Sequence, residues 1–326
     1  MKFVNAFKYI FIIALVAGLI VLIYHFFLKD EIIEISSEEI SELIDMDVSF
    51  ESYDFFDDST LEINGLTIKS PYPKDKYKNV NDHHTDWISA RIGKVRLKKF
   101  DYDKLIANKR FFASSIEIDS AEIDVYRDKT LPEPPYKHKP LVASILKSAN
   151  ADIALDTLYL RRINIRYFEK TKHSPEPGRI SFVNLFATGY NLTNDSARIA
   201  ENPNLTLDAQ SDLMGEAQIK AHVVFDLTSE NDFFSFSADV EPFQATTLNS
   251  VITGVLPAKI TDGQVKEMTI SFEANEDKAA GTVDFQYENM QFELFDDESS
   301  GLKSLITTEA AKLAMKKDNL KDNGTF

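Results

Sequence analysis

The feature that most constrains this chain is an alternating apolar pattern that changes phase within one segment. In residues 158–167, Leu158 and Leu160 hold even positions, whereas the apolar residues that follow hold odd positions. Alternation predicts a strand with one buried face, because successive side chains of a strand point to opposite sides of a sheet. The change of parity falls at Arg161 and Arg162. It predicts a bulge there, since an extra residue returns the later apolar side chains to the same face.

The same pattern recurs at residues 116–126 and, in a shorter form, at residues 61–68. Three copies indicate one β unit that is reused along the chain. We expect the apolar residues of the two longer copies to line the inner side of a curved sheet. These candidates for a lipid groove are Ile116, Ile118, Ile123, Val125, Leu158, Leu160, Ile163 and Ile165. Two interpretations stay open: an apolar groove that holds acyl chains, or an ordinary core in which these residues pack on one another.

The rest of the chain fits a mainly β fold of the α+β class, a curved antiparallel sheet with short connecting helices. Further strands are predicted at 48–55, 217–227, 233–240, 268–274 and 282–295, and short helices at 36–44, 102–106, 141–146 and 248–255. A proline-rich connector at 131–140 separates two similar halves of one domain, which we place at residues 29–298. An amphipathic helix and a polar tail are expected at 299–326, docked on the sheet or lying on a membrane.

The first thirty residues predict the location of the protein. Residues 9–28 form an apolar run of about 30 Å in helical form, enough to cross one hydrocarbon core. Lys2 and Lys8 precede the run, and Asp30 and Glu31 follow it closely. The positive-inside rule therefore places residues 1–8 in the cytoplasm and the bulk of the chain beyond the membrane. A cleaved signal peptide is the alternative, but its apolar region would be shorter.

Composition and motifs exclude several classes of function. A net charge of -16 opposes binding to nucleic acid, and the absence of cysteine removes disulfides and thiolate sites. No nucleophile elbow, zinc-protease pair or phosphate-binding loop occurs, so we expect neither an enzyme nor a cofactor. We expect no metal site: the Asp54, Asp57 and Asp58 cluster lacks the glycine and terminal glutamate of a calcium loop and suits a solvated acidic face, and His83 and His84 lack a third ligand.

One basic segment has two interpretations. Lys94, Arg96 and Lys98 alternate with Val95 and Leu97, which places the three cations on one face of a strand. They form either a solvated sheet face or a patch for anionic lipid head groups.

The arrangement resembles the AsmA-like proteins of bacterial envelopes, a group related to TamB and to bridge-like lipid carriers. The resemblance rests on an N-terminal apolar run followed by strand–helix–strand patterns, and it covers most of residues 1–295. The segments that carry it are Leu61–Ile68, Arg91–Leu97, Leu105–Ile106, Ile116–Arg127, Asp262–Ile270 and Gly281–Tyr287. The proline connector and the short chain depart from the long bridge-forming members, so we do not expect this chain to span the whole envelope.

The resemblance implies a twisted, U-shaped β groove and a role in envelope lipid homeostasis or phospholipid transport. The expected partners are a membrane lipid, with phospholipid first, and an unidentified envelope protein. The expected location is the bacterial inner membrane, with one span and most of the chain in the periplasm. The alternative function is an anchored β-domain scaffold that binds an envelope protein or polymer and carries no lipid.

Overall fold

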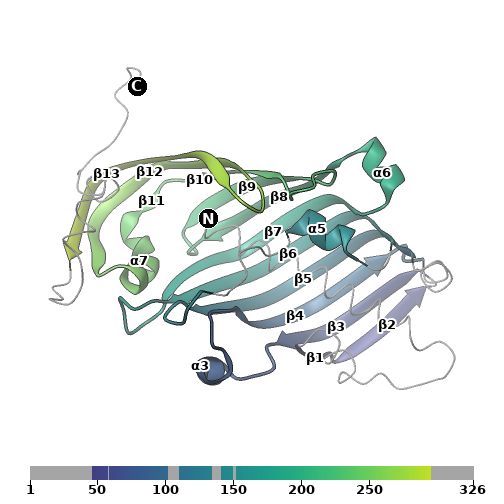
Figure 1. The fold of residues 1–326 in the computed structure, drawn as a ribbon, viewed down its shortest axis with the longest axis horizontal. Coiled ribbons are helices and arrows are strands. Elements are labelled where there is room, and N and C mark those ends of the chain that lie inside the picture. The colour runs from purple at the N-terminus through teal and green to yellow at the C-terminus, as the bar shows by residue number, and fades with distance from the viewer. Residues whose placement is uncertain (1–45, 58, 102–109, 134–140, 150–151, 295–326) are drawn as a thin grey trace, which may run out of the picture.

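The computed structural model of the protein describes residues 46–57, 59–101, 110–133, 141–149 and 152–294. These residues form one large sheet with few short helices (Figure 1). The strands are β1 (Asp47–Ser49), β2 (Ser52–Asp57), β3 (Thr60–Lys69), β4 (Trp87–Lys98), β5 (Arg110–Asp128), β6 (Asp152–Lys170), β7 (Gly178–Thr193), β8 (Asn204–Leu213), β9 (Ala217–Asp226), β10 (Phe234–Val240), β11 (Phe243–Gln244), β12 (Ala258–Ala274) and β13 (Ala279–Leu294). The short helices are η1 (Lys74–Lys76), α3 (Tyr77–Val80), α5 (Val142–Lys147), α6 (Ser196–Glu201), η2 (Ala245–Leu248) and α7 (Asn249–Val255).

The sheet is open and follows chain order for most of its width. Its order is β1-β3-β4-β5-β6-β7-β8-β9-β10-β12-β11, with β2 beside β3 and β13 beside β12. Figure 1 shows the sheet curling along this order, with α7 in the bend between β7 and β12. The mainly β prediction is therefore confirmed.

The prediction of a purely antiparallel sheet is wrong at one place. Strands β5 and β6 pair in parallel, with Ile116 opposite Leu158 and Ile123 opposite Ile165. A parallel pair needs a long crossover that returns the chain to the same end of the sheet. Residues 129–151, which include the proline-rich connector, are that crossover, and α5 lies within it. The sheet is thus continuous across the point where the sequence suggested two halves.

The predicted bulge at Arg162 is confirmed, and it belongs to a row that crosses the sheet. Arg162 has a φ of 53°, and Ser120 and Asn184 have φ values of 59° and 53° on the neighbouring strands. The register places Ser120 between Arg162 and Gly93, and Gly93 opposite Gly65, whose φ is 64°. In strands β3 to β7, the parity of the buried residues therefore changes at one row of residues that crosses the sheet. Gly93 suits this crowded line, because a Cβ there would lie 3.2 Å from the Cβ of Ser120.

The aligned bulges keep one face of the sheet apolar along its whole length. In β3, Leu61 and Ile63 are buried before the bulge, and Leu66 and Ile68 are buried after it. Buried apolar side chains from every long strand between β3 and β12 join one hydrophobic cluster. We call this the inner face and the opposite side the outer face.

Other predicted elements have mixed outcomes. The helices at 141–146 and 248–255 and the strands at 217–227, 233–240 and 282–295 are confirmed within a few residues, whereas the strand predicted at 268–274 is the second part of β12, which begins at Ala258. The single strand expected at 48–55 is instead two short strands, β1 and β2, which pair with opposite ends of β3. The segments 9–28, 36–44, 102–106 and 299–326 lie outside the described residues. Within the part of the chain that is described, no helix has the length and apolar character needed to cross a membrane.

Candidate functional site: the inner face and its polar rim

The structure brings the eight predicted lining residues together on the inner face. They are Ile116, Ile118, Ile123, Val125, Leu158, Leu160, Ile163 and Ile165, and each is only 0–4 % exposed. Parallel pairing sets those of β5 beside those of β6, as with Ile118 opposite Leu160. In this state the residues form part of a covered core, so an acyl chain would reach them only after a covering element moves.

Helix α5 is one covering element. Its apolar side, Val142, Ala143 and Leu146, joins the same cluster as the inner face. No side chain of its own N-terminal residue caps the helix. Instead, Asp232 in the β9–β10 loop accepts hydrogen bonds from the backbone N–H of Leu141 at 2.9 Å and of Ser144 at 2.7 Å.

The carboxylate of Asp232 is itself buried, and it satisfies two of the backbone donors that a helix start leaves unpaired. Two further contacts hold the other end of α5. Lys147 Nζ donates to the carbonyl of Ser229 at 2.5 Å, and the Asn194 amide donates to the carbonyl of Leu146 at 2.9 Å. Helix α5 therefore ties the β5–β6 crossover to the β9–β10 loop.

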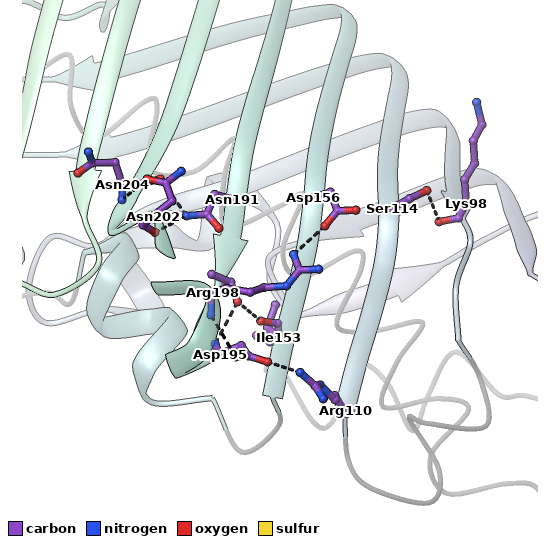
Figure 2. Close-up of polar contacts among 11 residues, drawn as sticks. Lys98, Arg110, Ser114, Ile153, Asp156, Asn191, Asp195, Arg198, Asn202 and Asn204 are labelled. Atoms are coloured by element: carbon purple, nitrogen blue, oxygen red, sulfur yellow. Dashed lines mark hydrogen bonds and ion pairs between the residues drawn. The ribbon is translucent and has the colours of Figure 1, made fainter. Parts of the chain in front are cut away.

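A row of polar residues crosses the sheet near α6, at a second point where the buried side chains change parity. Along β6 the buried residues change from Leu158 to Leu155 and Ile153 and so pass over Asp156, whose side chain is 44 % exposed. The register places Ser114 of β5 and Asn191 of β7, whose φ is 62°, in the row of Asp156. Arg198 of α6 reaches this row, with its Nη1 2.7 Å from Asp156 Oδ1 (Figure 2). The guanidinium of Arg198 also lies over the Phe112 ring, 5.6 Å from its centroid. We call these residues the polar rim.

Helix α6 is held at the rim by its own cap. The Asp195 carboxylate accepts from the backbone N–H of Ala197 at 2.9 Å and of Arg198 at 3.3 Å. Arg110 at the start of β5 forms an ion pair with the same carboxylate. Burial opposes ionisation of Asp195, but the backbone donors and Arg110 outweigh it and lower its pKa.

The outer face carries the predicted cations, each of which has an acidic partner. Lys94 Nζ lies 2.8 Å from Glu62 Oε1, Arg96 also pairs with Glu62, and Lys98 lies 4.0 Å from Glu117. The hydrogen bond from Lys94 is the largest cause of the lowered pKa of Glu62. Strand β4, which carries the three cations, thus lies between acidic residues of β3 and β5. This geometry fits a solvated sheet face better than a patch for anionic head groups.

A buried polar cluster occupies the end of the sheet far from α6. Arg127 is paired with Asp86 by two hydrogen bonds of 2.6 and 2.5 Å, and both side chains are nearly covered. Burial raises the pKa of Tyr126 to about 12 and also raises the pKa of Tyr167, whose hydroxyl donates to Glu169 at 3.0 Å. These groups have structural partners in the fold, which gives them a stabilising role.

The structure describes most of the acidic and histidine residues that were considered above as metal ligands. His83 lies beside Asp82, with 2.5 Å between Nδ1 and Oδ1. Asp54 is exposed on β2, and Asp58 lies outside the described residues. Across the described parts of the chain, no group of three or more histidine or acidic residues is placed to hold a metal ion.

The structure also contains a cavity that sequence reasoning missed. It has a volume of about 480 Å³ and lies on the outer face of β6 to β10. Paired positions on these strands form one row of its lining: Tyr159, Thr188, Asp208, His222 and Ser237. Such a row becomes visible only when the register of five strands is known.

No family model and no curated protein matches the chain. The AsmA-like resemblance therefore stays an expectation drawn from the sequence.

Proposed function

We propose that this protein is a membrane-anchored, AsmA-like protein of the bacterial envelope, without enzymatic activity, that holds phospholipid acyl chains against the inner face of its sheet. The observation that carries the proposal is the continuous apolar face from β3 to β12. Burial of acyl chains on such a face is favourable by about 0.8 kcal/mol per methylene group.

The rim supplies groups that suit a lipid head group. Arg198 and Arg110 are cations, Asp156 and Asp195 are anions, and the side chains of Arg198 and Asp156 are 31 % and 44 % exposed. A head group that carries both charges would find a partner for each. To reach the inner face beside Leu158 and Ile116, the acyl chains would have to pass around the end of the sheet near α6.

Loading requires a covering element to move, because the inner face is buried in this structure. Helix α5 is the candidate, since it is six residues long and its N-terminal hydrogen bonds go to one carboxylate in a different loop. The proposed location is the inner membrane, with residues 9–28 as the anchor and the sheet in the periplasm. Such an anchor would hold the apolar face next to a source of lipid.

Charged substitutions on the inner face test the proposal. The full-length protein is extracted from membranes in mild detergent, and bound lipid is identified by native mass spectrometry and by cross-linking to a photoreactive diacyl phospholipid. The variant Ile163→Asp places a carboxylate on the inner face of β6, and Thr157→Asp places the same charge on the outer face of that strand. We expect phospholipid on the wild type and on Thr157→Asp, and none on a folded Ile163→Asp.

Three results would contradict the proposal. The first is a wild-type protein with no bound phospholipid, and the second is a folded Ile163→Asp variant that retains it. The third is an Ile163→Asp variant that unfolds while the photoreactive lipid fails to cross-link to the inner face of the wild type. That outcome would make the eight residues an ordinary closed core, because an unpaired buried charge is strongly destabilising.

The second candidate is an anchored β-domain scaffold that binds an envelope protein or polymer without lipid cargo. The cavity on the outer face favours it, because that cavity offers polar groups on a surface that lipid tails would avoid. A scaffold predicts a lipid-free wild type in the experiment above.

A further inference from the structure

The outer-face cavity is hollowed by a row of small residues on the other side of the sheet. Ala187, Ala209, Ala221 and Ala238 pair in sequence across β7, β8, β9 and β10. Their side chains belong to the inner face, where most of the neighbouring row is larger, as at Leu207. Ala187, Ala209 and Ala221 also belong to the lining of the cavity on the opposite side. We attribute the hollow to these small side chains, which leave room for the backbone to approach the core. The hollow therefore follows from how the core is packed.

The cavity lies over the middle of the sheet, away from any edge. Each strand from β6 to β10 is paired on both sides. Their backbone groups are engaged in the ladders, so a peptide cannot add to them as a further strand. A ligand in this cavity must be recognised by side chains.

The side chains divide the cavity into an aromatic end and a polar end. Tyr159 of β6 and Phe186 of β7 lie at one end, and the lining of β8 to β10 is almost entirely polar. The second row of the lining continues from Phe186 through Gln210 and Lys220 to Asp239. Both rows cross the strands, so the long direction of the site runs from β6 to β10.

The charges within the cavity are balanced. Arg161 and Lys220 are cations, and Asp208 and Asp239 are anions. Two of the four have partners: Arg161 Nε lies 2.6 Å from Glu117 Oε1, and Asp208 Oδ1 lies 2.7 Å from His222 Nδ1. The site therefore offers no excess charge to an anionic head group, a phosphate or a nucleic acid. The polar end likewise suits no acyl chain.

We propose that this cavity binds a neutral, linear oligosaccharide. The C–H face of a pyranose ring is apolar and fits an aromatic side chain, and its hydroxyls donate to carboxylates and accept from amide, hydroxyl and ammonium groups. The cavity provides both kinds of surface in order along one line, and its volume lies in the range of about 300–1,000 Å³ typical of ligand sites. The inference does not depend on lipid binding, because it concerns the opposite face of the sheet.

Binding of defined sugars to the full-length protein tests the inference. The protein is kept in a polyoxyethylene detergent, because detergents with sugar head groups would compete for the site. The probes are neutral hexasaccharides of α-1,4-glucose, β-1,4-glucose and β-1,4-N-acetylglucosamine, with a sulfated hexasaccharide for comparison. Calorimetry measures binding at low and high sodium chloride concentration.

We expect at least one neutral probe to bind with little change between the two salt concentrations, since no charge on the ligand is screened. Gln210→Ala and Tyr159→Ala should each weaken that binding tenfold or more. The matched control is Gln218→Ala, which removes the same side chain from the outer face of β9 outside the cavity. It should leave the affinity within twofold of wild type.

The inference fails if no neutral probe binds, or if binding occurs and the two cavity variants leave it unchanged. Preferential, salt-sensitive binding of the sulfated probe would also overturn it, because it would make the site a receptor for anions. Circular dichroism spectra of both variants must match that of the wild type, which shows that they are folded. Loss of affinity in a folded Gln210→Ala variant would support binding of the sugar in this cavity.

Discussion

Helix α7 approaches the start of β7 so closely that a single methyl group should displace it. A Cβ built on Gly254 would lie 2.0 Å from the backbone nitrogen of Gly178 and 2.7 Å from the carbonyl carbon of Pro177. Ordinary van der Waals contact begins near 3.4 Å, and these neighbours are backbone atoms, which cannot swing aside. The variant Gly254→Ala therefore forces α7 away from the sheet by more than an ångström.

Two opposing effects decide the sign of the change in stability. Replacement of glycine by alanine inside a helix is favourable by about 1 kcal/mol from conformational preference alone. Overpacking a closely fitted contact costs about 1–3 kcal/mol, and more where backbone must shift. The shift would also weaken the 2.9 Å hydrogen bond from Thr171 Oγ1 to the Gly254 carbonyl. We expect the steric effect to win, with a net loss of about 2 kcal/mol in the free energy of unfolding.

Urea unfolding followed by the fluorescence of Trp87, the single tryptophan, measures this loss. Ser250→Ala is the control in the same helix, because it raises helix preference without a steric penalty. It also removes a buried hydroxyl for which the described residues provide no hydrogen-bond partner. The control should be neutral or slightly stabilising. A Gly254→Ala variant as stable as wild type, or more stable, would refute the close approach of α7 to β7.

Three further predictions concern the ends of the sheet. Asp232→Ala should lower stability by about 1–2 kcal/mol, the usual cost of a lost helix cap, and hydrogen exchange at the Ser144 amide should accelerate; unchanged exchange would contradict the α5 contact. Arg127→Met should cost about 3–5 kcal/mol by leaving the buried Asp86 carboxylate without its main cation, and Asp86→Asn in the same chain should recover part of the loss in urea unfolding. Tyr126 should titrate near pH 12 when phenolate absorbance is followed. Its contribution to stability is therefore present below its unfolded pKa of about 10 and is lost as the pH rises through 12. Phenolate absorbance that titrates fully by pH 10 would contradict the burial of Tyr126.

The sequence predicted the bulge in β6 because the pattern of buried residues changes within a short segment, whereas the alignment of this bulge with those of the neighbouring strands was not predicted. A parity change at Arg161 and Arg162 can be read within ten residues, and its physical cause is local too, since one extra residue restores the buried face. The same logic explains why the eight lining residues were found. They alternate strictly, and alternation is the simplest consequence of strand geometry.

The direction of strand β6 could not be read in this way. An alternating strand buries the same side chains whether its neighbour runs parallel or antiparallel. The patterns of β5 and β6 therefore do not reveal the relative direction of the two strands. The connector at 131–140 offered the only clue, because its length permits a crossover. A long connector also suits the two similar halves of one domain that the sequence suggested, and the strands on both sides of it belong to one continuous sheet.

The outer-face cavity is even harder to predict from the sequence than the direction of β6, although each residue that forms it can be found in the sequence. Ala187, Ala209, Ala221 and Ala238 stand on four strands, and nothing in their spacing shows that they form one row. Only the register aligns them, and only the alignment turns four small residues into a dip that crosses the sheet. Because side chains alternate, a dip towards the core on one face is a hollow on the other. Packing that serves stability on the inner face can thus create a binding site on the outer face, which is why the two proposed ligands, a lipid and a sugar, can be tested independently on one sheet.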